Sequence, residues 1–210
     1  MDVNDFYVAA QDYGFTDLSN ATLLRALQGT VDAVERLRPW PFLEASATLT
    51  FAGSTELPAT APPRIRAVLR ASIIGTGARL RPVRVDDFED WAKGDYAKDG
   101  TPRIYVMRAG VLEFWPRPAA TDTVKLRYIQ FSPRMADATL EAAILVPARH
   151  HEVLLFGMLR RLYDQQDDPE LALTMAQQYQ QLVAEMVEDL TKQQYDEPEF
   201  IHVTDVEDYF

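Results

Sequence analysis

The spacing of apolar residues changes twice along this 210-residue chain. It follows a helical period up to residue 38, an alternating period of two from residue 44 to 131, and a helical period again after Pro147. Helices repeat a face about every 3.6 residues and strands every two, so one type of secondary structure cannot serve all three stretches. The sequence therefore predicts an α+β fold, in which N- and C-terminal helices form a helical bundle around an inserted small antiparallel β sandwich or barrel.

Four segments follow from this pattern. Residues 1–43 are predicted to be the N-terminal helices of a helical body, and 44–135 a β-rich insert. Residues 136–193 are predicted to be the C-terminal helices, and 194–210 an extended acidic C-terminal arm. Helices from both ends are expected to pack together, because each has an apolar stripe to bury.

Start and stop residues support four helices. Residues 2–13 precede Gly14, and a longer helix is predicted from an N-cap at Thr16 or Asp17 to Arg38, before two prolines. The helix after Pro147 is apolar over most of its circumference and is expected to lie centrally. Asp168 and Pro169 start the last helix as N-cap and first helical residue. The residues expected in the core of this body are Leu24, Leu27, Val31, Val34, Leu155, Leu159, Leu162, Met175, Tyr179, Leu182 and Met186.

About six short strands are predicted between the helices. They cover residues 46–51, 64–70, 80–85, 103–108, 111–115 and 123–131, with one or two helical turns at 86–91. In the last strand Val124, Leu126, Tyr128 and Gln130 are predicted to share one face, and Lys125, Arg127, Ile129 and Phe131 the other. Arginines also alternate along residues 64–70 and 80–85, which indicates a half-buried sheet with a wet, basic face.

Charge is unevenly distributed along the chain. The net charge of −11 divides into −3 for residues 1–42, +4 for 43–135 and −12 for 136–210. We expect the middle segment to be able to meet an acidic partner and the last segment to repel nucleic acid. The alternative is that the acidic surface only aids solubility.

The chain lacks features of secreted, membrane and enzymatic proteins. It has no cysteine, its N-terminus does not resemble a secretory signal, and no apolar run is long enough to span a membrane, so we expect a soluble protein made in a cytoplasm. His150 and His151 are adjacent and point about 100° apart on a helix, which favours a structural role over a metal site. No phosphate loop or nucleophile elbow is present. We therefore expect no enzymatic activity and no cofactor.

Two groups of aromatic residues allow more than one interpretation. Trp40, Trp91 and Trp115 could form a platform for a sugar or base, but each adjoins an element boundary, which favours core packing. In the arm, six acids and no Lys or Arg accompany β-prone and aromatic residues, which is unusual for a solvating tail. The residues expected to dock on a partner are Phe200, Ile201, Val203, Val206, Tyr209 and Phe210.

Several motifs together resemble the adaptor proteins of the head-to-tail connector of tailed bacteriophages, a group related to the tail tubular A proteins of short-tailed phages. Residues 38–44 read RPWPFLE, similar to the family's R-x-W-P-F-L-E junction, in which Trp40, Pro41 and Phe42 join the helices to the insert. Residues 100–105 and 112–118 resemble its G-x-P-x-x-Y and L-x-L-x-P-x-P hairpin. Further matching segments are 124–128, Ser132-Pro133, 146–154 and the paired C-terminal helices. The resemblance covers about 15–193; Met1–Tyr13 and the arm depart from it.

This resemblance implies a structural function in the virion neck, after assembly in the host cytoplasm. The expected partners are further copies in a ring of typically twelve subunits, the portal protein above and a tail or stopper protein below. Genomic DNA would pass through the channel without sequence-specific binding. One rival hypothesis is a binding module whose insert recognises a carbohydrate or peptide, as a tail accessory or host-surface reader. Another is a hydrolase built on the carboxylates of residues 86–90.

Overall fold

The computed structural model describes residues 3–51, 65–94, 98–108, 111–119, 122–135 and 144–196. The chain divides into two compact units, each of which is described by itself. The helical unit comprises residues 1–31 and 146–210, and the β unit comprises residues 32–145. Five α-helices and two small sheets appear in the described ranges, so the fold is α+β as the sequence predicts. The four-segment division of the sequence stays a prediction.

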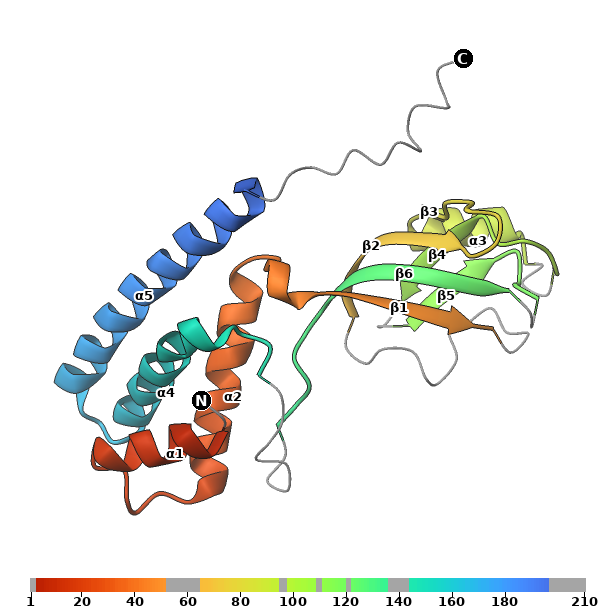
Figure 1. Cartoon of the computed structure of the whole chain (residues 1–210). Helices are drawn as coiled ribbons and strands as arrows, with labels where there is room; N and C mark the ends of the chain where they lie inside the picture. The colour runs from red at the N-terminus through yellow and green to blue at the C-terminus, as the bar shows by residue number, and fades with distance from the viewer. Residues whose placement is uncertain are drawn as a thin grey trace. The chain divides into compact units, whose positions relative to one another are not determined.

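The helical unit brings helices from both ends of the chain together. It contains α1 (Val3–Asp12), the first turns of α2 (Asn20–Leu37), the 3-10 helix η2 (Ala148–His150), α4 (His151–Gln165) and α5 (Pro169–Asp196). Helices α4 and α5 lie side by side and run in opposite directions (Figure 1). At 1.5 Å per residue the 28 residues of α5 span about 42 Å. This helix takes in the first three residues of the predicted arm; residues 197–210, including all six residues expected to dock, lie outside the described ranges.

Capping residues explain where these helices begin. The Asp168 carboxylate accepts a hydrogen bond from the Leu171 N–H at 3.1 Å, which confirms it as the N-cap of α5. The N-cap of α2 was wrongly predicted as Thr16 or Asp17. Ser19 takes that role, because its hydroxyl accepts the Thr22 N–H at 3.3 Å. Phe15 is buried edge-to-face against Tyr163 at 4.8 Å, so the chain turns after it before the helix begins.

Helix α4 meets two other helices at one glycine. A Cβ atom on Gly157 would lie 2.4 Å from Thr30 Cγ2 of α2 and 3.0 Å from the ring of Tyr179 of α5. Eight of the residues of α4 are buried, as its largely apolar circumference predicts. Among the residues expected in the core of the helical body, Leu155, Tyr179 and Leu182 are half-buried, and Val34 is buried but belongs to the β unit. The others are buried in the helical unit: Leu24, Leu27, Val31, Leu159, Leu162, Met175 and Met186.

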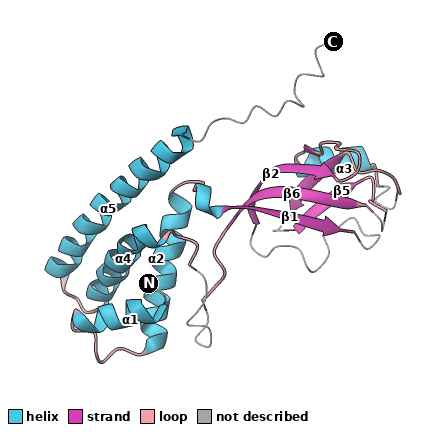
Figure 2. Ribbon diagram, in the orientation of Figure 1, coloured by secondary structure: helices cyan, strands magenta, loops and turns pink. Residues whose placement is uncertain are grey.

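Two three-stranded sheets make up the β unit (Figure 2). The first has the order β1 (Glu44–Thr50), β6 (Thr123–Gln130), β2 (Ile65–Ile73), with antiparallel pairing throughout. The second has the order β3 (Arg81–Pro82), β4 (Ile104–Arg108), β5 (Val111–Trp115). The sheets share one core, which includes Phe51, Phe114 and Leu126. Helix α3 (Val85–Ala92) packs on β4 through Phe88, Ile104 and Val106. The β unit is therefore layered as sheet, sheet and helix.

The structure selects between the two predicted forms of this unit and differs from the prediction in three respects. Two sheets share one core, as in the predicted sandwich, and the described strands form no closed barrel. Strand β3 pairs parallel with β4, so the strands are not all antiparallel. Strand β3 has two residues, fewer than the predicted 80–85, because α3 already begins at Val85. The pairing with β4 ends at Val83, whose N–H donates to the Tyr105 carbonyl. In β6 the predicted alternation holds for residues 124–128, but Ile129 is buried as well.

The Gly157 contact yields a prediction about stability. Replacing Gly157 by alanine should lower the free energy of unfolding of the helical unit by roughly 1–3 kcal/mol, because the added methyl group overlaps Thr30 and Tyr179. Alanine otherwise favours a helix by about 1 kcal/mol over glycine, so the sign of the change identifies the steric effect. Urea unfolding followed by the circular dichroism of the helices measures it.

Gly29→Ala in α2 is the matched control. The nearest atoms to its Cβ atom would be those of the Arg161 guanidinium, at 3.2 Å, and a flexible side-chain end can move. This variant should be as stable as the parent chain or more stable, by up to about 1 kcal/mol, because alanine favours the helix. Equal destabilisation by both substitutions would contradict the assignment of Gly157 as the tight contact between helices.

Candidate functional site

The two histidines singled out in the sequence contact different parts of the helical unit. Nε2 of His150 lies 3.0 Å from Asp189 Oδ2, whereas Nε2 of the buried His151 lies 2.9 Å from the Val146 carbonyl oxygen. Both contacts are structural, and the rings do not converge. Across the described ranges no group of three His, Cys, Asp or Glu side chains is arranged to hold a metal ion. In the same ranges, no helix has the length and apolar content needed to cross a membrane.

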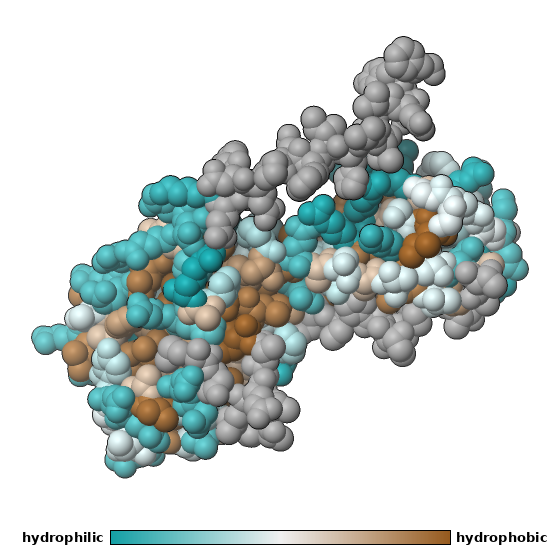
Figure 3. All heavy atoms as spheres, viewed as in Figure 1, coloured by the Kyte–Doolittle hydropathy of each residue, from teal (hydrophilic) through white to brown (hydrophobic). Residues whose placement is uncertain are grey.

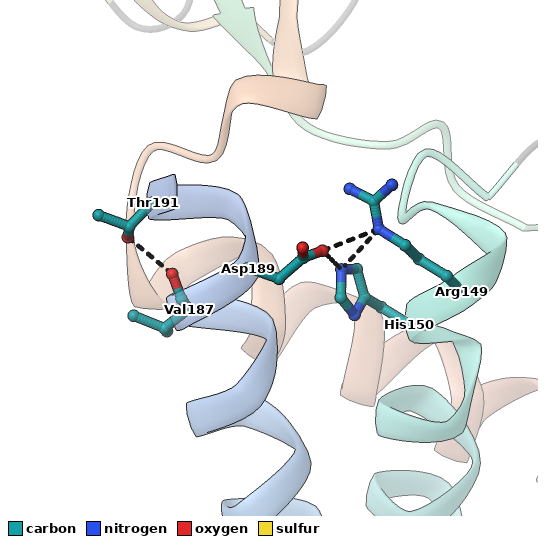
Figure 4. Close-up of polar contacts among 5 residues, drawn as sticks. All are labelled: Arg149, His150, Val187, Asp189 and Thr191. Atoms are coloured by element: carbon teal, nitrogen blue, oxygen red, sulfur yellow. Dashed lines mark hydrogen bonds and ion pairs between the residues drawn. The ribbon is translucent and has the colours of Figure 1, made fainter. Parts of the chain in front are cut away.

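Asp189 joins α5 to the start of α4 (Figure 4). Its Oδ2 atom forms an ion pair with Arg149, 2.9 Å from Nε, and lies 3.0 Å from His150 Nε2. Arg149 Nε also lies 3.2 Å from His150 Nε2. In the tautomer that carries a hydrogen on Nε2, His150 donates to Asp189; in the other tautomer, Nε2 accepts from Arg149. The three side chains therefore stay in contact in either tautomer. This contact, termed the α4–α5 clamp, holds α5 seven residues before its end at Asp196.

The acidic character of the last segment continues onto α5. The helix carries Glu170, Glu185, Glu188, Asp189 and Asp196 but only one base, Lys192, which pairs with Glu188 at 2.7 Å. Hydrophilic residues cover most of the face of α5 that Figure 3 shows. A helix of this charge presents a surface that repels other polyanions.

The predicted helix-to-insert junction lies within the β unit. Trp40 is 1% exposed, its indole N–H donates to the Val34 carbonyl at 2.7 Å, and its ring stacks on half-buried Phe42 at 5.7 Å. Pro41 is exposed and starts the 3-10 helix η1 (Pro41–Leu43). Because Pro39 and Pro41 end α2, its last carbonyl groups lack helical partners. The Trp40 indole supplies one of the missing donors.

Arg66 of β2 supplies further donors to the same helix end. Its Nη1 atom donates to the Glu35 carbonyl at 2.7 Å and to the Arg38 carbonyl at 3.1 Å. Its guanidinium also lies 5.7 Å from the centroid of the Phe131 ring. The junction thus closes α2 with side chains from two segments that are distant in sequence.

Sequence reasoning missed the most buried charge of the junction. Glu35 of α2 is 0% exposed, and its carboxylate accepts the Ser132 N–H at 3.2 and 3.1 Å as well as the Ser132 hydroxyl. A signal for it exists in the sequence. Glu35 lies four residues after Val31 and eight after Leu27, so it falls on the apolar stripe of its helix. An acid at such a position needs a buried hydrogen-bond partner.

This geometry predicts the effect of removing the carboxylate. Glu35→Ala leaves the N–H and hydroxyl of Ser132 buried without this acceptor, which should lower the free energy of unfolding of the β unit by about 2–3 kcal/mol. All three tryptophans lie in the β unit, so their fluorescence in a urea titration measures the change. Glu89→Ala, at an exposed position of α3 in the same unit, is the control and should cost under about 1 kcal/mol. A Glu35→Ala chain as stable as the control would refute the role of this contact.

Comparison with known proteins identifies the family. Among curated proteins, none matches the chain. The model of one family, described as SU10 adaptor protein, matches residues 1–200. The match includes residues 1–13, which the sequence motifs alone had wrongly placed outside the resemblance, and the first residues of the arm. A structural family is also consistent with the expectation of a non-enzymatic chain.

The match thus spans both units, with the buried junction of the β unit and the clamped α5 inside it. The chain belongs to the SU10 adaptor protein family, and it is a structural protein of the head-to-tail connector of a tailed bacteriophage.

Proposed function

We propose that this adaptor forms a ring, typically of twelve subunits, beneath the portal protein of the capsid. The ring extends the channel through which genomic DNA passes, and it offers an attachment surface for the tail or a stopper protein. The observation that carries this proposal is the family match over residues 1–200, because an adaptor must contact one assembly above it and another below.

The charge of the helical unit supports a role beside DNA. Glu170, Glu185 and Glu188 are exposed on α5, and the segment from residue 136 to the end carries a net charge of −12. Such a surface repels phosphates over roughly the 8–10 Å of a Debye length, so DNA moving past it would not adhere. The proposal accordingly includes no sequence-specific binding of DNA.

The clamp supports a role for the arm. Arg149 and His150 hold α5 at Asp189, so the arm begins from a helix that is tied to its neighbour. The arm contains six apolar residues that suit docking: Phe200, Ile201, Val203, Val206, Tyr209 and Phe210. Burying each aromatic side chain contributes roughly 1.5–3 kcal/mol. Repetition around a ring makes many such contacts act together, which secures the joint.

One observation favours a second candidate, a binding module. A cavity of about 600 Å³ in the β unit is lined by Trp91, Trp115, Lys93, Lys98 and Asp90 together with Ala92. Trp91 is 52% exposed, and Lys98 Nζ lies 5.6 Å from the centroid of the Trp115 ring. An exposed indole ring, that of Trp91, and the half-buried ring of Trp115 beside polar side chains suit the apolar face and hydroxyl groups of a sugar. Under this candidate, Trp91→Ala would reduce adsorption to host cells while the particles keep their tails.

Truncation tests the connector proposal. A chain ending at Asp196 retains all of α5 and the clamp, so it should fold with unchanged helix content, yet its capsids should leak DNA or lack tails. Electron microscopy and infectivity of the particles measure the effect. A second variant keeps the acids of the arm and replaces its six apolar residues by serine. Because the proposal assigns docking to the apolar residues, this variant should show the same defect as the truncated chain. Normal infectivity of the truncated phage would contradict a docking role for the arm.

The position of the ring has a separate test. A label fused to the C-terminus should appear in particle images at the single capsid vertex that carries the tail. Label density at other vertices or along the tail fibres would rule out the proposed place in the virion.

A further inference from the structure

The outer face of the β1–β6–β2 sheet carries two rows of polar and basic side chains. The register places Thr48, Lys125 and Ser72 in one row across the sheet, and Ser46, Arg127 and Arg70 in the next. Neighbouring positions on each strand point the other way, into the core with Leu126 and Val124. Figure 3 shows this face as mostly hydrophilic or neutral, with one small apolar patch. We refer to this surface as the basic face, because it carries Arg70, Lys125 and Arg127.

Two cations oppose each other directly on this face. Arg70 of β2 is the register partner of Arg127 of β6, and like charges at paired positions destabilise a sheet. Arg127 has an internal partner, because its guanidinium is hydrogen-bonded to the Glu44 carboxylate, which raises the pKa of Arg127. Within the described ranges Arg70 and Lys125 form no ion pair, and both are exposed. The face therefore carries uncompensated positive charge that an external anion would stabilise.

Exposed aliphatic side chains lie beside the basic face. Ile74, two residues after Ser72, is 48% exposed, and Leu69, next to Arg70 at a register shift of β2, is 43% exposed. A DNA backbone would contact the cations but would gain nothing from these apolar groups. A peptide that mixes acids with apolar residues would use both. The composition of the face thus favours an acidic, apolar polypeptide over nucleic acid.

The chain itself contains a segment of this chemistry. Residues 197–210 carry five acids, namely Glu197, Glu199, Asp205, Glu207 and Asp208, and no Lys or Arg. Apolar residues alternate with these acids near the end, as Asp205-Val206-Glu207 and Asp208-Tyr209. At about 3.3–3.6 Å per residue the 14 residues can reach up to about 50 Å, far more than the roughly 10 Å across three strands.

We propose that the basic face binds the C-terminal segment 197–210 of a second copy of this chain. The inference rests on the proposed ring, which places copies next to one another, and it names the surface on which the arm docks. Carboxylates of the arm pair with Arg70 and Lys125, and its apolar residues cover Leu69 and Ile74. A contact between copies joins neighbouring subunits, which a contact within one chain would not do.

Zero-length cross-linking of the full-length protein tests the proposal. Light and heavy-nitrogen-labelled chains are mixed over a range of concentrations and treated with a carbodiimide, which joins a lysine amine to a carboxylate in contact with it. Lys125 should become linked to Asp205, Glu207 or Asp208, and the linked peptides should include light–heavy pairs. Lys192 and Glu188, at 2.7 Å within one chain, provide the internal control and should give same-isotope links only.

A charge reversal identifies the face. Arg70→Glu should reduce the yield of light–heavy links at Lys125 about tenfold, the loss expected for one charge-assisted contact. Arg25→Glu, at an exposed position of α2, is the matched control and should leave the yield unchanged. Raising the salt concentration should weaken the parent's links as well, because exposed charges are screened.

Three results would overturn the proposal. Absence of Lys125 links at every concentration, while Lys192–Glu188 links form, would show that the arm does not reach this face. Same-isotope links alone would place the arm on its own chain. Retardation of a DNA duplex that Arg70→Glu abolishes, without Lys125 links, would make the face a nucleic-acid surface. None of these results alters the particle phenotype of the truncated chain, so failure here is distinct from failure of the proposed function.

Discussion

The organisation of the β unit depends on one buried carboxylate. Glu35 on α2 accepts the backbone N–H and hydroxyl of Ser132, 97 residues later, immediately after β6. Strand β6 is the centre of its sheet, because both β1 and β2 pair with it. The contact therefore fixes the end of the central strand against the last turns of α2. Arg66 and Trp40 complete the same helix end, so the charge is held within a network of satisfied groups.

The two units present surfaces of opposite character. Carboxylates predominate on α5, where the one lysine is already paired with Glu188. Cations predominate on the outer face of the β1–β6–β2 sheet, where Arg70 and Arg127 are directly opposed. A subunit with an acidic helical surface and a basic sheet is suited both to exclude DNA and to bind an acidic segment of its neighbour. This separation of charge, more than any cavity, is the physical basis of the proposed connector function.

Local signals in the sequence predicted the start of a helix where an interaction within one turn decides it. Asp168 followed by Pro169 begins α5 because a carboxylate cap and a fixed proline φ act within one turn. Ser19 was missed as the cap of α2, since Thr16 and Asp17 precede the same helix and the burial of Phe15 against Tyr163 decides where the helix begins. The parallel pairing of β3 with β4 was missed for another reason: two residues carry no periodicity that reveals their partner.

The sequence by itself determined the α+β class, the order of elements, the two polarities of charge and the central place of α4. Each of these depends on periodicity, capping or composition, which act along the chain. Only the tertiary structure decided that the two sheets share one core without closing into a barrel, that Gly157 is where three helices meet, and that Glu35 pairs with Ser132. Those contacts join residues far apart in sequence, and no local pattern specifies which distant group will satisfy a buried one.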